Sequence, residues 1–284
     1  MIKSYKTRRS LGNAVIYVIL TILSIIWVLP LAWIVMTSFS GEEASFIDTV
    51  IPTCWTLDNY IELFTNTQVF DYPRAFLNTL FVSICSCVIS TFSVLMVSYT
   101  FSRLRFKARK AFMNVAMILG MFPGFMTMIA IYYILKVIGL SENIVGLIIV
   151  YSAGASLGYF ISKGFFDTIP KALDEAATID GATKNQIFWQ IILPMSKPIV
   201  VYTILTAFIG PWTDFLMAKM LLRTSTDQFT VAILLWNMTD KEKVDQFFYN
   251  FCAGSVLVAV PITALFLKMQ KFYVEGITGG AVKG

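Results

Sequence analysis

The chain has 284 residues, of which 57% are hydrophobic and 14% charged, with a formal net charge of +5 and a mean hydropathy of +0.73. Ordinary soluble domains hold about 45–50% apolar residues even with glycine included, and about 25% charged residues. A soluble fold of this length could not keep so much apolar surface from water, so we expect an all-α integral membrane protein. The positive net charge fits a membrane-topology bias and does not indicate nucleic-acid binding.

Long stretches without Asp, Glu, Lys or Arg predict the membrane-spanning helices. A helix needs roughly 20 apolar residues to cross about 30 Å of hydrocarbon. Five stretches reach that length, and a sixth does so only if it continues past Asp214 to about Leu222. We therefore expect six helices in a single transmembrane domain covering residues 1–284, at about 11–39, 75–101, 111–138, 143–163, 198–222 and 246–270.

The distribution of Lys and Arg predicts the orientation of these helices. Most of the 22 Lys and Arg residues lie in the N-terminal segment, in 101–110, in 163–197 and at the C-terminal end. Cytoplasmic connections are enriched in Lys and Arg, so we expect both termini and the 164–197 loop in the cytoplasm and the 40–73 loop outside it. The first apolar run is longer than the roughly 7–15 residues of a signal peptide. We therefore expect an uncleaved first helix in a multi-pass protein of a prokaryotic cell membrane.

The sequence lacks the residues that would make this chain an enzyme by itself. It contains no histidine, which removes Ser-His-Asp and Cys-His nucleophile pairs. The spacing of the four cysteines does not suit a zinc site, and no histidine is present to complete one. No G-x-x-x-x-G-K-[ST] motif occurs, so the chain cannot bind ATP through a P-loop. We expect no metal, no catalytic residue and no cofactor on this chain; if its transport is driven by ATP, the ATPase is another chain.

The predicted loop at 40–73 is acidic, with six Asp and Glu residues and no Lys or Arg. Its prolines and aromatic residues predict an ordered cap over the membrane. It is either a simple acidic connector or a surface on which a partner docks, and the sequence leaves both interpretations open.

The third predicted helix contains Gly120, Pro123 and Gly124 near its middle. Proline removes one backbone hydrogen bond and obstructs the preceding turn, so a kink is expected there. Such breaks line cavities in transporters, where freed carbonyls need polar partners. They also occur as packing kinks, so Pro123 is a candidate pathway residue with a structural alternative.

The fifth predicted helix carries an acidic residue in the stretch "FIGPWTDFL", residues 208–216. An ionisable group inside a membrane segment is a functional hypothesis by default. Trp212 and Phe215 beside Asp214 suit stacking on a sugar together with hydrogen bonding to its hydroxyl groups. The alternative is that Asp214 lies at the outer interface and Trp212 belongs to the interfacial aromatic belt.

The stretch "EAATIDGATKNQIFWQIILP", residues 175–194, is too polar to cross a bilayer. Leu173, Ala176 and Ala177 share one face of a short helix, and Gly181 is a natural helix stop. Thr183 then begins a second helix with a T-x-x-Q capping box. Acidic residues disfavour binding to DNA phosphate, and the missing basic face disfavours a membrane-surface helix. A docking platform for a cytoplasmic partner fits best.

The same stretch resembles the EAA loop of the membrane subunits of ABC importers, written EAA-x3-G-x9-I-x-L-P. Glu175 to Ala177, Gly181, Ile191, Leu193 and Pro194 all match at the required spacing. The surroundings resemble the carbohydrate-uptake branch in "FSRLRFKARK", "MFP", "FIGPWTDFL" and the terminal "GITGGAVKG". The resemblance extends over essentially the whole chain and is closest to the second permease of maltose/maltodextrin-type importers, which implies the type I ABC importer permease fold.

The resemblance implies a set of partners and sites. The first loop helix would be the coupling helix, which docks on an ATP-binding subunit through Leu173, Glu175, Ala176, Ala177, Asp180 and Gly181. The tail with Gly279, Gly280 and Lys283 would reach between two ATPase subunits, which bind ATP and magnesium. The complex would also contain a second homologous permease, in a heterodimer, and an extracytoplasmic sugar-binding protein, but no nucleic acid.

The expected function is that of the membrane-spanning permease of an ATP-driven importer for a maltodextrin-like or related oligosaccharide. The resemblance implies that Trp212 and Asp214 only line the pathway, because the other permease of the maltose system holds most of the sugar. Phe215 and Pro123 are the other candidate pathway residues. A permease for another solute, such as glycerol phosphate, would predict basic pathway residues. A secondary transporter would need coupling ions, and usually an internal repeat that the sequence does not show.

Overall fold

The computed structural model describes residues 5–42, 50–153 and 156–281 of the chain. In this part of the chain the regular elements are helices, and the one extended pairing is an isolated bridge between Ser40 and Trp55. The prediction of an all-α protein is therefore confirmed. The chain divides into two compact units, one of Met1–Asp71 with Asn237–Leu257 and one of Tyr72–Trp236 with Val258–Gly284.

The first unit contains the N-terminal helix and the loop expected at 40–73. Helix α1 (Tyr5–Thr37) contains an apolar stretch, Gly12–Thr37, that is long enough to span a membrane. Helix α2 (Asp58–Thr65) orders the loop through a buried amide. The Asn59 Nδ2 donates to the backbone carbonyls of Ser38 and Ser40, at 3.1 and 2.7 Å.

The second unit is a helical bundle organised around one long helix, α3. Its helices are α3 (Tyr72–Arg103), α4 (Arg109–Gly120), α5 (Gly124–Val137), α6 (Ile144–Ala153), α7 (Ser156–Thr168), α8 (Ala172–Ile179), α9 (Lys184–Gln186), a π-helix (Ile187–Ile192), α10 (Leu193–Met195), α11 (Lys197–Thr213), α12 (Leu216–Leu222), a 3-10 turn (Thr226–Gln228), most of α13 (Val231–Met238) and the second part of α14 (Val244–Ala281).

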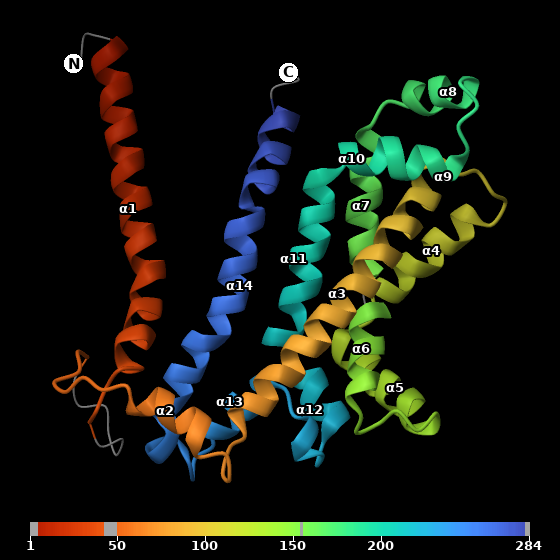
Figure 1. The fold of residues 1–284 in the computed structure, drawn as a ribbon. Coiled ribbons are helices and arrows are strands. Elements are labelled where there is room, and N and C mark those ends of the chain that lie inside the picture. Colours follow the sequence, from red (N-terminus) through yellow and green to blue (C-terminus); the bar gives the residue numbers. More distant parts are fainter. Residues whose placement is uncertain (1–4, 43–49, 154–155, 282–284) are drawn as a thin grey trace. The chain divides into compact units, whose positions relative to one another are not determined.

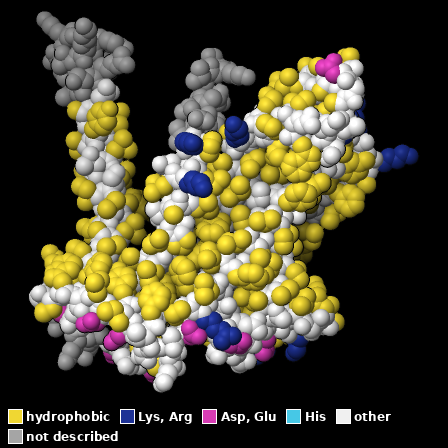
Figure 2. Space-filling view, viewed as in Figure 1, with side chains coloured by type: hydrophobic (Ala, Val, Ile, Leu, Met, Phe, Trp, Pro, Cys, Tyr) yellow, Lys and Arg dark blue, Asp and Glu magenta, His cyan; other side chains and the backbone are white. Residues whose placement is uncertain are grey.

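Helix α3 packs against α6, α7 and α11. Its buried serines, such as Ser83, Ser86 and Ser98, let neighbouring backbones approach closely. One apolar cluster forms around Val82 and Leu147 and a second around Phe166. Figure 1 shows α8 beyond the C-terminal end of α3, at the opposite end of this unit from α5 and α12. Hydrophobic side chains cover the visible faces of the helices in Figure 2.

The described helices include four that are long and apolar enough to span a membrane, and up to six if each of two bent pairs is one span. The expected third helix is one such pair, because α4 and α5 meet at 105°. Pro123, in an extended conformation with ψ 125°, separates them. A kink was expected there, and the structure shows a sharp break.

The expected helix at 198–222 also differs from a single span. Helix α11 ends at Thr213 and α12 begins at Leu216, because Asp214 adopts an extended conformation with ψ 102°. The Asp214 Oδ1 accepts a hydrogen bond from the backbone N–H of Met217 at 3.0 Å and so caps the first turn of α12.

Candidate functional site

The predicted loop with two short helices is present at the end of the second unit. Helix α8 ends before Gly181, which has φ +86°, a left-handed conformation that other residues adopt only with strain. Thr183 and Gln186 form the predicted capping box, with the Thr183 N–H donating to Gln186 Oε1 at 2.8 Å. The turn and the capping box are therefore confirmed. The π-helix that follows at Ile187–Ile192 was not predicted.

The structure separates the apolar residues of α8 into an inner and an outer face. Ala177 is 8% exposed and packs into the cluster that contains Tyr99 and Phe166. Leu173 and Ala176 are exposed, and Ile179 is 86% exposed. We call Leu173, Ala176 and Ile179 the outer stripe of α8.

The sequence predicted that Ala177 shares a face with Leu173 and Ala176, and Ile179 was not among the predicted docking residues. Leu173, Ala176 and Ile179 recur at every third position, so the same periodic pattern is also compatible with these three residues sharing the exposed face. Glu175, Asp180 and Gly181, which were predicted to take part in docking, are also exposed. The exposed surface of α8 and the turn after it thus contains both a small apolar stripe and carboxylates.

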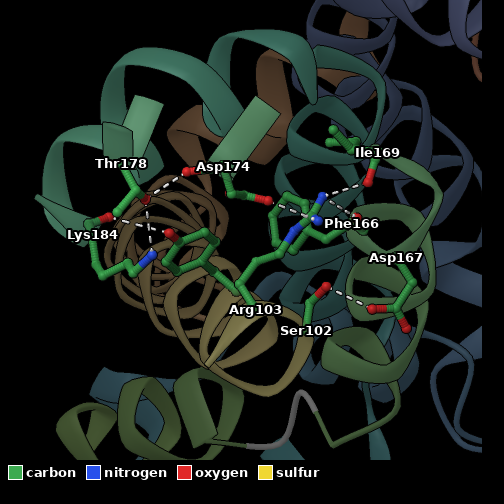
Figure 3. Close-up of polar contacts among 9 residues, drawn as sticks. Ser102, Arg103, Phe166, Asp167, Ile169, Asp174, Thr178 and Lys184 are labelled. Carbon is green, nitrogen blue, oxygen red and sulfur yellow. Dashed lines mark hydrogen bonds and ion pairs between the residues drawn. The ribbon is translucent and has the colours of Figure 1, made fainter. Parts of the chain in front are cut away.

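The C-terminal end of α3 is joined to this loop by a polar network (Figure 3). The Arg103 guanidinium lies 2.9 Å from Asp174 Oδ2, and its Nη2 donates to the carbonyls of Phe166 and Ile169, each at 2.8 Å. The neighbouring Ser102 hydroxyl donates to the Asp167 carboxylate at 2.6 Å. One turn earlier, the Tyr99 hydroxyl donates to the backbone carbonyl of Lys184 at 3.2 Å.

A cavity of about 470 Å³ lies deeper in the bundle, between α3, α6, α7, α11 and the start of α12. Hydroxyl groups and one carboxylate line it among apolar side chains, from Ser90, Tyr151, Tyr202, Thr203, Thr206 and Asp214. Four lining residues of α11 and its end are spaced four apart, at 202, 206, 210 and 214. That spacing places them on one helix face. Sequence analysis did not identify Tyr202 and Thr206, although their spacing from Asp214 was a signal that could have indicated them.

Asp214 lines this cavity, as expected for a pathway residue, but its carboxylate already has partners. The Oδ1 caps α12, and the Oδ2 accepts a hydrogen bond from the Tyr151 hydroxyl at 3.2 Å. Each carboxylate oxygen can accept a further bond. Asp214 therefore ties α12 to α6 and still presents acceptor capacity to the cavity.

The other three predicted pathway residues do not line the cavity. Trp212 is 2% exposed and packs edge-on against Phe76, with ring centroids 5.1 Å apart. Phe215 stacks on Trp236 at 4.6 Å, and Pro123 is exposed between α4 and α5. The Trp212 ring is thus enclosed by this chain and is not open to a solute in this conformation.

The predicted tail lies at the C-terminal end of α14. Gly279 and Gly280 belong to the last turns of that helix. Lys283 lies outside the described residues.

Comparison with known proteins places the chain among transport proteins. Residues 89–273 match the family described as binding-protein-dependent transport system inner membrane component. The galactooligosaccharides transport system permease protein GanQ of Bacillus subtilis is 33% identical over 285 residues, and the alignment covers 100% of both chains. The maltodextrin transport system permease protein MalD of Streptococcus pneumoniae is 35% identical over 287 residues, again with 100% of both chains covered.

The fold has a counterpart among solved structures. A chain in the crystal structure of a bacterial ABC transporter involved in the import of the acidic polysaccharide alginate superposes with a TM-score of 0.77. The alignment covers 96% of this chain and 99% of that chain at 21% identity. At this identity the likeness concerns the fold alone.

Proposed function

Because this chain belongs to the family of binding-protein-dependent transport system inner membrane components, we propose that it forms half of the translocation pathway of an ATP-driven oligosaccharide importer. It is a transport subunit of the cell membrane and not an enzyme. Its complex contains a second permease, two ATP-binding subunits that hold ATP and magnesium, and an extracytoplasmic sugar-binding protein. The α8 loop carries the proposal, since it presents an apolar stripe outside the core of its own chain.

The outer stripe of α8 supports docking on the ATP-binding subunit. Exposed apolar side chains on a short, well-anchored helix gain free energy when a partner covers them, at about 25 cal/mol per Å². Glu175 and Asp180 are exposed as well, and their carboxylates suit basic side chains of the partner. Ala177 serves the fold of the loop itself, because it is buried inside this chain.

The cavity supports a sugar rather than a phosphorylated solute. Its described lining contains hydroxyl groups and Asp214 but no Lys or Arg, and a phosphate ester would need cationic partners. The relatives are named for galactooligosaccharides and maltodextrin, so we propose an oligosaccharide of one of these classes. Hydroxyl side chains at this site would form weak, transient hydrogen bonds with the sugar hydroxyls during transport, and these would allow the sugar to be released.

Deletion of the gene is expected to remove high-affinity uptake of the sugar. Cells lacking the chain should lose accumulation of radiolabelled maltodextrin or galactooligosaccharides at micromolar concentrations, while glucose uptake stays unchanged. Uptake should return when the wild-type gene is supplied. Unchanged accumulation of both oligosaccharide classes in the deletion strain would contradict the proposed substrate class.

Removing the charge of Asp214 is expected to lower the rate of sugar transport without dissociating the complex. In Asp214→Asn the amide oxygen can still cap α12, so the change in unfolding free energy should stay within about 0.5 kcal/mol. Tyr151→Phe removes the hydrogen bond to Asp214 but no charge, so its comparison with Asp214→Asn separates loss of the charge from loss of this contact. Transport by both variants is measured as initial uptake in cells with equal amounts of complex. A wild-type rate in Asp214→Asn would leave Asp214 with a structural role only.

A further inference from the structure

Arg103 lies where three segments of the second unit meet, and it binds all of them. Its own helix, α3, ends at this residue. Its Nη2 donates to the Phe166 and Ile169 carbonyls at the end of α7, and its Nη1 faces Asp174 in the first turn of α8. The side chain of Arg103 is 4% exposed and that of Asp174 is 14% exposed, so water screens this contact little.

The chemistry of the corner explains why an arginine fits it. The last carbonyls of a helix have no partner within the helix and carry a partial negative charge, which a cation stabilises. The first turn of a helix has the opposite polarity and favours a carboxylate such as Asp174. A planar guanidinium offers five donors in fixed directions, so one side chain can satisfy the end of α7 and the start of α8 together. A lysine could reach one of these partners but not hold all three.

Other contacts attach the same loop to the last turns of α3. The Tyr99 hydroxyl donates to the Lys184 carbonyl in α9, beyond the Gly181 turn. Ala177 packs in the same apolar cluster as Tyr99 and Phe166. The loop is thus fixed to α3 both before and after its turn, as Figure 3 shows around Arg103. Two attachment points prevent α8 from rotating independently of α3.

The middle of α3 reaches the cavity. Ser90 and Val94 line it, two to four turns along the helix from Arg103. A helix is stiff over such a length, so a displacement applied at its end moves the cavity wall as well. The loop and the cavity are therefore connected by one element.

We propose that Arg103 is a positioning residue that makes α8 and α3 move as one body, so that displacement of α8 by the ATP-binding subunit changes the cavity wall. This inference rests on the proposed function and adds the residue through which coupling passes. Ion pairing with Asp174 and capping of α7 are the two contacts that it uses. Loss of Arg103 separates ATP hydrolysis from sugar movement.

The test compares Arg103→Met with Lys107→Met in the complete transporter reconstituted in liposomes. Lys107 is the matched control, since it is an exposed cation of the connection that follows α3 and loses the same charge. Sugar uptake and ATP hydrolysis are measured in the same liposomes. Arg103→Met should retain at least half of the ATPase activity while sugar moved per ATP falls at least tenfold; Lys107→Met should keep the wild-type ratio. An unchanged ratio in Arg103→Met, or a parallel fall of both rates, would overturn the proposal.

A second measurement tests whether Arg103 fixes α8 to α3, even if the variant shows no sugar uptake. Spin labels at Thr178 in α8 and Met96 in α3, both exposed positions, report the distance between the two helices. In the wild type the distribution of distances should be narrow, with the same mean with and without ATP. Arg103→Met should broaden the distribution, and Arg103→Lys should broaden it less. A narrow and unchanged distribution of distances in Arg103→Met would refute the proposal that Arg103 makes α8 and α3 move as one body. Absence of ATP-driven uptake by the wild-type complex would instead refute the proposed function.

Discussion

Replacing Ile179 with Asp is expected to abolish sugar uptake while the chain still folds and inserts. Ile179 is 86% exposed, so the substitution breaks no contact inside this chain, and the free energy of unfolding should change by no more than about 0.5 kcal/mol. In the docked complex the same position would place an unpaired carboxylate in an apolar contact. Residues at the centre of such contacts carry about 2 kcal/mol or more, which corresponds to at least roughly thirtyfold weaker binding of the ATP-binding subunit.

Asn185→Asp provides the matched control for this prediction. Asn185 is exposed on α9 and gains the same negative charge away from the outer stripe of α8. Co-purification of the ATP-binding subunit and uptake are measured for both variants. The Ile179 variant should lose both and the Asn185 variant neither. Full recovery of the ATP-binding subunit with Ile179→Asp would show that the outer stripe is not the docking face.

Replacing Ala177 with Leu is expected to destabilise the chain itself, in contrast to the same change at its neighbour Ala176. Ala177 is 8% exposed among Tyr99, Phe166 and other large side chains, and additional methyl groups in such a core cost about 1–3 kcal/mol. For a chain of this size that corresponds to a fall in Tm of roughly 2–4 °C per kcal/mol. Ala176 is exposed, so its variant should melt as the wild type does and lose only partner binding.

Thermal unfolding of the two alanine variants in detergent separates these roles. Ala177→Leu should lower the Tm and the yield of the membrane-inserted chain, and weak uptake would then follow from loss of the fold. Ala176→Leu should keep the Tm and weaken retention of the ATP-binding subunit. The reverse pattern would mean that Ala177, and not Ala176, contacts the partner.

The sequence predicted the helical elements well where local chemistry decides them. Gly181 and the Thr183 capping box act within one turn of chain, and both are present as predicted. The side of α8 that faces inward depends on α3 and α7, which are distant in sequence, so the periodic pattern alone allowed two groupings. Only the packing of Tyr99 and Phe166 against the loop decides that Ala177 is buried and Ile179 is exposed.

The membrane segments show the same limit. Apolar length predicts candidate spans, but it does not register a break that a single side chain stabilises. Asp214 was predicted as an ionisable group within a continuous helix, and in the structure it ends α11 and caps α12. Trp212 was predicted to stack on sugar because it lies two residues before Asp214 in the sequence. Neighbours in a helix point in different directions, and Trp212 is enclosed by Phe76 and Phe208.

The most direct test of the proposed function is ATP-dependent sugar accumulation in liposomes that contain this chain, the second permease and the ATP-binding subunits. The sugar-binding protein and radiolabelled oligosaccharide are supplied on the opposite side from ATP. We expect the oligosaccharide to accumulate against its concentration gradient. This accumulation should need ATP, magnesium and the binding protein, and it should be lost with Ile179→Asp. ATP-independent uptake by this chain alone, or uptake unaffected by Ile179→Asp, would contradict the proposed function.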